Sequence, residues 1–260
     1  MNHLTQNSPR TRRDFLKSSC ILLGTAVVSS AVPSSLLAQD DAQRIDALRK
    51  QLSGPLQVSK VSGNVSMLTG AGGNIGILTG TEGKFIVDSG VAPSTTGVLQ
   101  ALNQLDALPL KYLINTHWHF DHTDGNVKFH EAGAAIVATD KTRDRLSAPQ
   151  YIDVFQLHFP ASPAAALPTR TLNSAFTFYH DGEEILLQSL PAAHTDTDLF
   201  VYFKNADVLH TGDVFFNGFY PLIDYSTGGS ANGYVDGMAK LLLVSKDSTK
   251  IIPGPWATGL

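Results

Sequence analysis

Three histidines and one aspartate fall within six consecutive positions, and this cluster constrains the chain more than any other feature. It comprises His117, His119, Asp121 and His122, directly after a strand-like run that ends near Asn115. In an extended backbone, residues i and i+2 point the same way, so His117 and His119 can bind one ion together. Asp121 and His122, on the turn that follows, can reach a second ion. Imidazole and carboxylate groups are ligands that zinc accepts, so the cluster predicts a metal site.

The composition excludes several classes of protein. The chain has 260 residues, of which 43% are hydrophobic and 16% are charged. This length permits one large domain or two small ones, with an ample core. The formal net charge of −4 argues against a nucleic-acid-binding protein, which would usually present a basic face. The single cysteine excludes a fold held together by internal disulfides.

Residues 1–38 have the pattern of an export signal. Arg12 and Arg13 precede a short apolar run from Cys20 to Val28, and small residues lead up to Ala38. This order is typical of a signal peptide, and the paired arginines resemble a bacterial twin-arginine signal. The apolar run is too short to span a membrane. We therefore expect a periplasmic protein without stable membrane insertion after cleavage, whose mature chain lacks cysteine and binds metal through histidine and carboxylate groups.

Residues 57–260 are predicted to form one domain after a polar linker at residues 39–56. Each half of the domain is rich in strand-like runs and then turns helical, which predicts two packed sheets with helices outside. Helical periodicity marks residues 94–106 and 233–244. Short β-like runs lie at residues 65–68, 74–78, 84–88, 111–115, 134–138, 175–180, 184–190, 200–203, 207–210 and 251–252.

Some segments and side chains carry more specific expectations. Four prolines within residues 147–168 indicate a long surface loop. Trp118 and Phe120 are expected to pack beneath the loop at residues 117–122, called the metal loop below, and His210 is expected to lie in the core. The helix at 233–244 is expected to turn Val235, Met238, Leu241 and Leu242 inward. The histidines without partners in the sequence are expected at the surface, namely His130, His158 and His180.

The cluster resembles the His-x-His-x-Asp-His signature of the metallo-β-lactamase superfamily of metallohydrolases. Other parts of the chain follow that family in order, from about residue 57 to residue 254. Asp88 ends a strand-like run where the family has an aspartate that supports the metal ligands. His194 matches a further ligand of the first metal, and Asp213 matches the aspartate that bridges two metals.

The resemblance implies a four-layer αββα sandwich with the metals at one edge of its two sheets. It places His117, His119 and His194 on a first zinc ion. Asp121 and His122 would bind a second zinc, with Asp213 shared between the two ions. The expected nucleophile is a hydroxide held by the metals, which lower the pKa of bound water toward about 7. Asp121 would also be catalytic by orienting that hydroxide.

The chain departs from the family after its last strand-like run. The family continues with Pro-Gly-His-Gly, whose histidine binds the second metal, whereas this chain has Pro253, Gly254, Pro255 and Trp256. We therefore expect a doubtful second zinc site and a domain that is incomplete at its C-terminus, without the family's closing helix. A one-base frameshift after Gly254 is our hypothesis for this departure, because a shifted reading of a His-Gly-Pro-Leu-Ala sequence yields the residues found.

Aromatic residues after Asp213 predict an apolar substrate mouth, formed by Phe215, Phe216, Phe219 and Tyr220. We expect a zinc hydrolase of small molecules, acting on an ester, lactone, thioester or amide bond. One alternative is a metallo-β-lactamase that hydrolyses β-lactams. A second is a persulfide dioxygenase-like enzyme with one iron on His117, His194 and Asp213. A third is a non-catalytic remnant with a damaged second metal site.

Overall fold

The computed structural model describes residues 34–254, and the signal peptide predicted for residues 1–38 lies almost entirely outside that range. Pro255 and Trp256 also lie outside it. The chain divides into two compact units, Met1–Leu37 and Ala38–Leu260, and the second unit contains both sheets. Among the described residues, no helix is both long and apolar enough to cross a membrane.

The segment predicted as a linker is folded. Helix α2 (Ser34–Leu52) leads directly into strand β1 (Ser53–Ser62). From Asp40 onward most residues of this helix are exposed, in keeping with its polar composition. Ile45 is nevertheless only 2% exposed and packs into a hydrophobic cluster with Trp118 and Phe120. Leu48 and Leu52 are partly buried against the same cluster, and these few apolar side chains give the polar helix too weak a periodicity to be recognised in the sequence.

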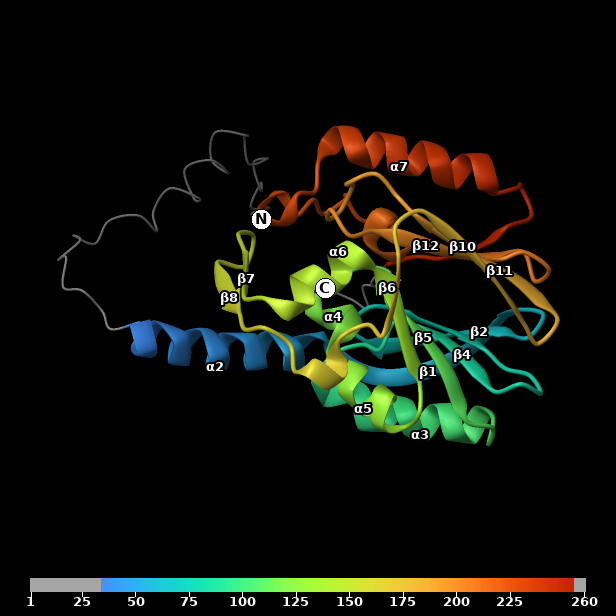
Figure 1. Ribbon diagram of the computed structural model, residues 1–260, viewed down its shortest axis with the longest axis horizontal. Coiled ribbons are helices and arrows are strands. Elements are labelled where there is room, and N and C mark those ends of the chain that lie inside the picture. Colours follow the sequence, from blue (N-terminus) through green and yellow to red (C-terminus); the bar gives the residue numbers. More distant parts are fainter. Residues whose placement is uncertain (1–33, 255–260) are drawn as a thin grey trace, which may run out of the picture. The chain divides into compact units, whose positions relative to one another are not determined.

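The first sheet has seven strands in the order β1-β2-β3-β4-β5-β6-β9. Strands β1 to β4 pair antiparallel, and β4, β5, β6 and β9 pair parallel. Helices α3 (Thr95–Leu105) and α5 (Asn126–Glu131) cover its outer face, where Val98, Leu102 and Phe129 are buried (Figure 1). The remaining strands of this sheet are β2 (Val65–Ala71), β3 (Ile75–Leu78), β4 (Lys84–Val87), β5 (Leu110–Ile114), β6 (Ala135–Thr139) and β9 (Arg170–Leu172).

The second sheet has five strands in the order β10-β11-β12-β13-β14. The hairpin of β10 (Ala175–His180) and β11 (Glu183–Ser189) turns at Asp181 and Gly182, both with positive φ, as the sequence predicts. Strands β12 (Leu199–Phe203) and β13 (Val208–His210) continue it antiparallel, and β14 (Lys250–Ile252) joins β13 in parallel. Helix α7 (Ala231–Val244) covers its outer face (Figure 1).

The two sheets face each other across a fully apolar core. Val65, Phe85 and Ile114 of the first sheet meet Leu187 and Val201 of the second, all with no exposed surface. Helices therefore lie outside two stacked sheets, which confirms the predicted αββα fold. Short elements complete it: α4 (Phe120–Thr123), α6 (Asp140–Ser147), and the 3-10 turns Ala92–Ser94, Ala164–Ala166, Gly212–Val214 and Tyr225–Thr227.

The prediction of a long surface loop at residues 147–168 is wrong. Strands β7 (Gln150–Ile152) and β8 (Leu157–Phe159) form a hairpin there, and Ile152, Leu157 and Phe159 are buried. Its apolar side chains pack in the same cluster as Phe120, with the Phe159 ring stacked on the Phe120 ring. The prolines flank this hairpin rather than extend through it.

The inward face predicted for the helix at 233–244 is wrong at two of its four positions. Leu241 is buried and Met238 is half-buried, but Val235 and Leu242 are each 70% exposed. Gly233 and Gly237 occupy the buried face instead. A Cβ at Gly233 would lie 1.8 Å from the carbonyl oxygen of Ala192. Glycine at this position therefore lets helix α7 pack closely against the backbone at Ala192. A search for apolar residues does not identify a buried helix face that is formed by glycine.

Candidate metal centre

The predicted metal ligands meet at one edge of the two sheets, although they come from four segments. His117 and His119 follow β5, and Asp121 and His122 lie in the short helix α4. His194 lies in the connection from β11 to β12, and Asp213 in the turn after β13. All six residues are at most 9% exposed. Trp118 and Phe120, which alternate with the ligands, are buried on the other side of the loop, as predicted.

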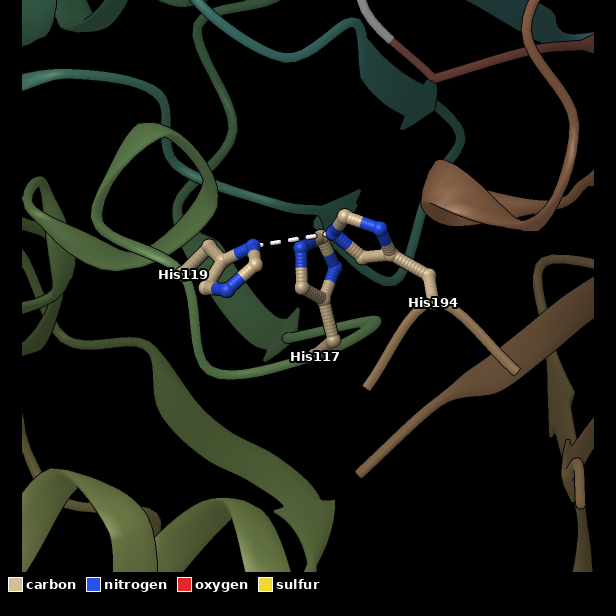
Figure 2. Close-up of side chains that lie close together, drawn as sticks. All are labelled: His117, His119 and His194. Atoms are coloured by element: carbon tan, nitrogen blue, oxygen red, sulfur yellow. Dashed lines mark hydrogen bonds between the residues drawn. The ribbon is translucent and has the colours of Figure 1, made fainter. Parts of the chain in front are cut away.

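Two groups of side chains have ligand atoms close enough to hold metal ions, and His117 belongs to both. One group is His117, His119 and His194, whose rings point toward one another in Figure 2. The other is His117, His122 and Asp213. Asp121 is in neither group, but its Oδ2 lies 3.4 Å from His122 Nε2. The division of these side chains between two particular ions stays a prediction.

The unpartnered atoms at the centre fit a cation. His117 Nε2, His122 Nε2 and Asp213 Oδ1 are buried without hydrogen-bond partners. His122 Nε2 and Asp213 Oδ1 lie 3.0 Å apart, but not in hydrogen-bonding geometry. Buried polar atoms in native proteins almost always have partners, so several orphans aimed at one point indicate a missing ligand. Their chemistry, imidazole nitrogen and carboxylate oxygen, is that of a zinc-type site.

Asp88, predicted to support the metal ligands, is hydrogen-bonded to one of them and to Thr116. Its Oδ2 accepts a hydrogen bond from His122 Nδ1 at 2.7 Å and from the Thr116 hydroxyl at 2.8 Å. Its Oδ1 accepts from the Thr116 amide at 2.8 Å. Since His122 Nδ1 donates to the carboxylate, Nε2 is the ring nitrogen that faces the centre. The φ of +67° at Asp88 is unusual for a residue other than glycine, and its many contacts hold it there.

The sequence analysis missed Asp224, which has a similar role toward His119. His119 Nε2 lies 2.9 Å from Asp224 Oδ2, so it donates to the carboxylate and leaves Nδ1 free. The hydroxyls of Ser226 and Thr227 and the Ser226 amide also donate to this carboxylate. An aspartate two residues before a serine is typical of a side-chain-stabilised turn, and this was the available signal. No local pattern could show its contact with a histidine 105 positions away.

His119 and His194 face each other through nitrogens that have no proton to share when both rings are neutral. His194 Nδ1 donates to the carbonyl oxygen of Leu222 at 2.8 Å, which leaves Nε2 free. That Nε2 lies 2.9 Å from His119 Nδ1, the contact dashed in Figure 2. Two lone pairs this close repel unless a cation lies between them. The geometry therefore fits a metal ion independently of the orphaned atoms.

The electrostatics without a bound metal divide the histidines into two kinds. Burial, together with the neighbouring imidazoles, holds the pKa of His117 well below its usual range. Burial likewise lowers the pKa of His194 to about 4, so both rings are neutral at pH 7. Burial would also lower the pKa of His122, but the surrounding carboxylates, Asp213 first, raise it well above its usual range. A metal ion must therefore displace a proton from His122.

Asp121 stays ionised beside His122. Burial raises its pKa, but the charge and hydrogen bond of His122 outweigh that effect and lower the pKa to about 2. Its side chain keeps 12% of its surface exposed, more than His122, which has none. A carboxylate at the open side of the centre can accept a hydrogen bond from a water molecule that enters.

The remaining histidines follow the predictions except at one position. His210 is fully buried and donates from Nε2 to the backbone oxygen of Asn74 at 3.0 Å. His130 and His158 are exposed. His180 was expected at the surface, which is wrong: it is 5% exposed and donates to the Gly83 carbonyl at 2.9 Å. It lies at the end of β10, where the β10–β11 hairpin of the second sheet contacts the residue before β4 of the first sheet.

The predicted substrate mouth is only partly supported by the structure. The Phe216 ring lies 6.1 Å from the His194 ring, and Phe219 and Tyr220 are 51% and 96% exposed. Phe215 instead lines a cavity of about 210 Å³ under α7, together with Met238. Consecutive side chains of an extended segment point to opposite sides, so Phe215 and Phe216 cannot both face the metal centre.

The fold and the site together define an αββα protein with a buried cluster of histidine and aspartate residues that could hold metal ions. The family model described as the metallo-β-lactamase superfamily matches residues 68–254, so the chain belongs to this superfamily. Similar solved structures include a metallo-β-lactamase from Pontibacter korlensis, with 18% identity and a TM-score of 0.64 over 77% of this chain and 91% of that one.

Two further solved structures have the same fold. The DIM-1 metallo-β-lactamase is 20% identical, with a TM-score of 0.61 over 77% of this chain and 89% of that one. A metallo-β-lactamase from Cronobacter sakazakii with a HARLDQ motif is 17% identical, with a TM-score of 0.63 over 79% of this chain and 81% of that one. At these identities the likeness shows the fold alone.

Proposed function

We propose that this protein is a zinc-dependent hydrolase of small molecules that cleaves an ester, lactone, thioester or related amide bond. The observation that carries the proposal is the pair of ligand groups that share His117 and leave buried ligand atoms without partners. Membership of the metallo-β-lactamase superfamily supports the same chemistry. His117, His119 and His194 would hold one zinc, and Asp121 and His122 would hold a second, with Asp213 shared between the two ions.

The chain's own residues prepare this chemistry. Zinc, when bound, lowers the pKa of water to about 7 and polarises a carbonyl oxygen. Asp88 and Asp224 orient His122 and His119 through hydrogen bonds. Asp121, ionised at neutral pH, accepts a hydrogen bond from the attacking water and orients its lone pair toward the substrate carbonyl.

The surroundings of the centre favour an uncharged acyl group. Phe216 lies beside His194, and the segment between Asp213 and Tyr225 contains no lysine or arginine. A substrate carboxylate would therefore meet no cation from this segment. An apolar or aromatic acyl group would instead bury surface against Phe216 and Phe219.

Hydrolysis of β-lactams is the second candidate. The solved structures that share the fold are named metallo-β-lactamases. The signal peptide predicted for residues 1–38 supports export to the periplasm, where an enzyme would encounter β-lactams. The lack of a cation between Asp213 and Tyr225 argues for the more general hydrolase, because β-lactams carry a carboxylate that a lysine or arginine would bind.

A panel of substrates tests the proposal. Purified mature protein, loaded with zinc, would be assayed on a neutral aryl ester, a lactone, a thioester and a chromogenic cephalosporin. We expect turnover of at least one of the first three, its loss on chelation and its return when zinc is added back. The matched control is His117→Ala, which removes the ligand common to both groups.

Each other outcome supports a different reading. Turnover of the cephalosporin alone would favour the β-lactamase. Iron in the purified protein, with oxygen uptake on a persulfide, would favour the dioxygenase. Bound metal without turnover of any substrate would favour the non-catalytic remnant, and would accord with Pro255 at the position of a family ligand.

A further inference from the structure

Helix α2 packs behind the metal centre, although it lies entirely outside the residues matched by the family model. Ile45 of α2 is buried in one cluster with Trp118 and Phe120. These two aromatic residues alternate with His117, His119 and Asp121 in the metal loop, so the loop presents ligands on one side and its packing face on the other. Figure 1 shows α2 running along this side of the fold, beside β7 and β8.

An ion pair joins α2 to the end of the metal loop. Arg49 Nε lies 2.7 Å from Asp124 Oδ2, and Arg49 Nη2 lies 2.8 Å from Asp124 Oδ1. This two-pronged geometry is the strongest that arginine and carboxylate can form. The side chains are 29% and 11% exposed, so solvent screens the pair less than a surface pair. Asp124 Oδ2 also accepts a hydrogen bond from the Ala92 amide at 3.3 Å.

Asp124 closes the helix that carries two of the predicted ligands. Helix α4 has only four residues, among them Asp121 and His122, and Asp124 is its C-terminal cap. The Asp124 amide donates to the Phe120 carbonyl at 2.9 Å. A helix this short has no stability of its own, so its contacts fix its orientation. The Arg49–Asp124 pair is one such contact, and the hydrogen bonds of Ser89 to the His122 carbonyl form another.

Helix α2 is itself held firmly at other points. Arg44 donates to the carbonyl oxygens of Phe155 and Gln156, in the turn between β7 and β8. Asp41 accepts from the amide and the ring of His158 on β8. Arg49 therefore extends from a helix that is anchored at Asp41 and Arg44, and can restrain the residue that it contacts.

We propose that Arg49 is a positioning residue of the metal centre, which acts through Asp124 to hold Asp121 and His122 in place for the ion shared with Asp213. Docking of α2 thus contributes to metal affinity, in addition to stability. The inference rests on the metal centre of the proposed function, but it does not depend on which substrate is cleaved.

The test is the affinity for Co²⁺, measured by competition with a chromophoric chelator and by the visible spectrum of the bound ion. We expect Arg49→Gln to bind Co²⁺ about tenfold more weakly, at the lower end of the effect of outer-shell partners. Arg49→Lys should lie between Arg49→Gln and the wild type, since it keeps the charge but loses the two-pronged contact. Lys50→Gln is the control, because its pair with Asp46 is exposed on the same helix.

Thermal unfolding with and without Co²⁺ separates positioning from simple stabilisation. A positioning role predicts that the increase in Tm on Co²⁺ addition is smaller in Arg49→Gln than in Lys50→Gln, because weaker binding stabilises less. An equal loss of Tm in both states, with unchanged Co²⁺ affinity, would overturn the proposal. The metal-free Tm also reports whether each variant folds. Because neither readout uses turnover, a failed hydrolysis screen leaves this inference standing.

Discussion

At the scale of single residues, the metal centre is organised by hydrogen bonds that occupy one nitrogen of each histidine. His122, His119 and His194 donate from the far side of the ring to Asp88, Asp224 and the Leu222 carbonyl. Each acceptor is a carboxylate or carbonyl, so the proton must be on the histidine. The other nitrogen of each ring therefore faces the centre: in His194 it keeps a lone pair, whereas His122 must first lose a proton to the arriving metal.

Asp224 provides the clearest test of this arrangement. Asp224→Asn removes the negative charge behind His119 and gives its Nε2–H a weaker partner. We expect metal affinity to fall about 10- to 100-fold, the usual effect of such second contacts. Competition with a chelator would measure it, with Asp236→Asn on the exposed face of α7 as the charge-matched control. Equal metal affinity in the two variants would show that Asp224 stabilises only the turn of Ser226 and Thr227.

Gly73 provides a steric test of the second ligand group. A Cβ at this position would lie 2.3 Å from Cε1 of the His122 ring, which a hydrogen bond to Asp88 holds in place. We expect Gly73→Ala to displace the ring and to abolish binding of the metal shared by His122 and Asp213. Gly54→Ala, whose nearest neighbour is 3.9 Å away, should keep wild-type metal content. Elemental analysis of both proteins decides, and a full metal complement in Gly73→Ala would contradict the assignment.

At the scale of elements, the sequence predicted the strands well and the packing faces poorly. Alternation and glycine turns placed the runs around β2 to β6 and the β10–β11 hairpin, because these signals are local. The hairpin of β7 and β8 was missed because prolines flank it, and α2 because Ile45, Leu48 and Leu52 are few apolar contacts within a mostly polar helix. The buried face of α7 consists partly of Gly233 and Gly237, whose role is the close approach that they permit.

Asp207 anchors the last strand and predicts a pH dependence. Its carboxylate accepts from Tyr202, Ser248 and Thr249, and these hydrogen bonds lower its pKa to about 2. A carboxylate with a lowered pKa in the folded state adds stability above its unfolded value, near 3.8, which is lost as the pH falls toward 2. We expect Asp207→Asn to be less stable than the wild type at pH 7.

Urea unfolding at a series of pH values would measure this difference. The free energy of unfolding of Asp207→Asn and of the wild type should converge as the pH falls below about 4. Asp247→Asn, at an exposed position next to Ser248 in the segment between α7 and β14, is the control. A difference that stays constant down to pH 3 would mean that the hydrogen bonds of Asp207 do not depend on its charge.

At the scale of the whole molecule, the site depends on the stacking of two sheets. His117, His119, Asp121 and His122 come from the first sheet's side of the core, whereas His194 and Asp213 come from the second. The sequence could predict the first four because they are adjacent along the chain. It could assign His194 and Asp213 only through the family resemblance, and it could not find Asp224, because their proximity exists only once the sheets pack.

The central claim is that this junction of the sheets binds metal through His117. The most direct measurement is metal content by elemental mass spectrometry of the purified mature chain beside His117→Ala, after dialysis against trace zinc. The account predicts at least one tightly bound metal ion per wild-type chain and a loss of metal from both positions in the variant. Wild-type protein with no more metal than the dialysis buffer, or a variant that retains the full wild-type content, would contradict it.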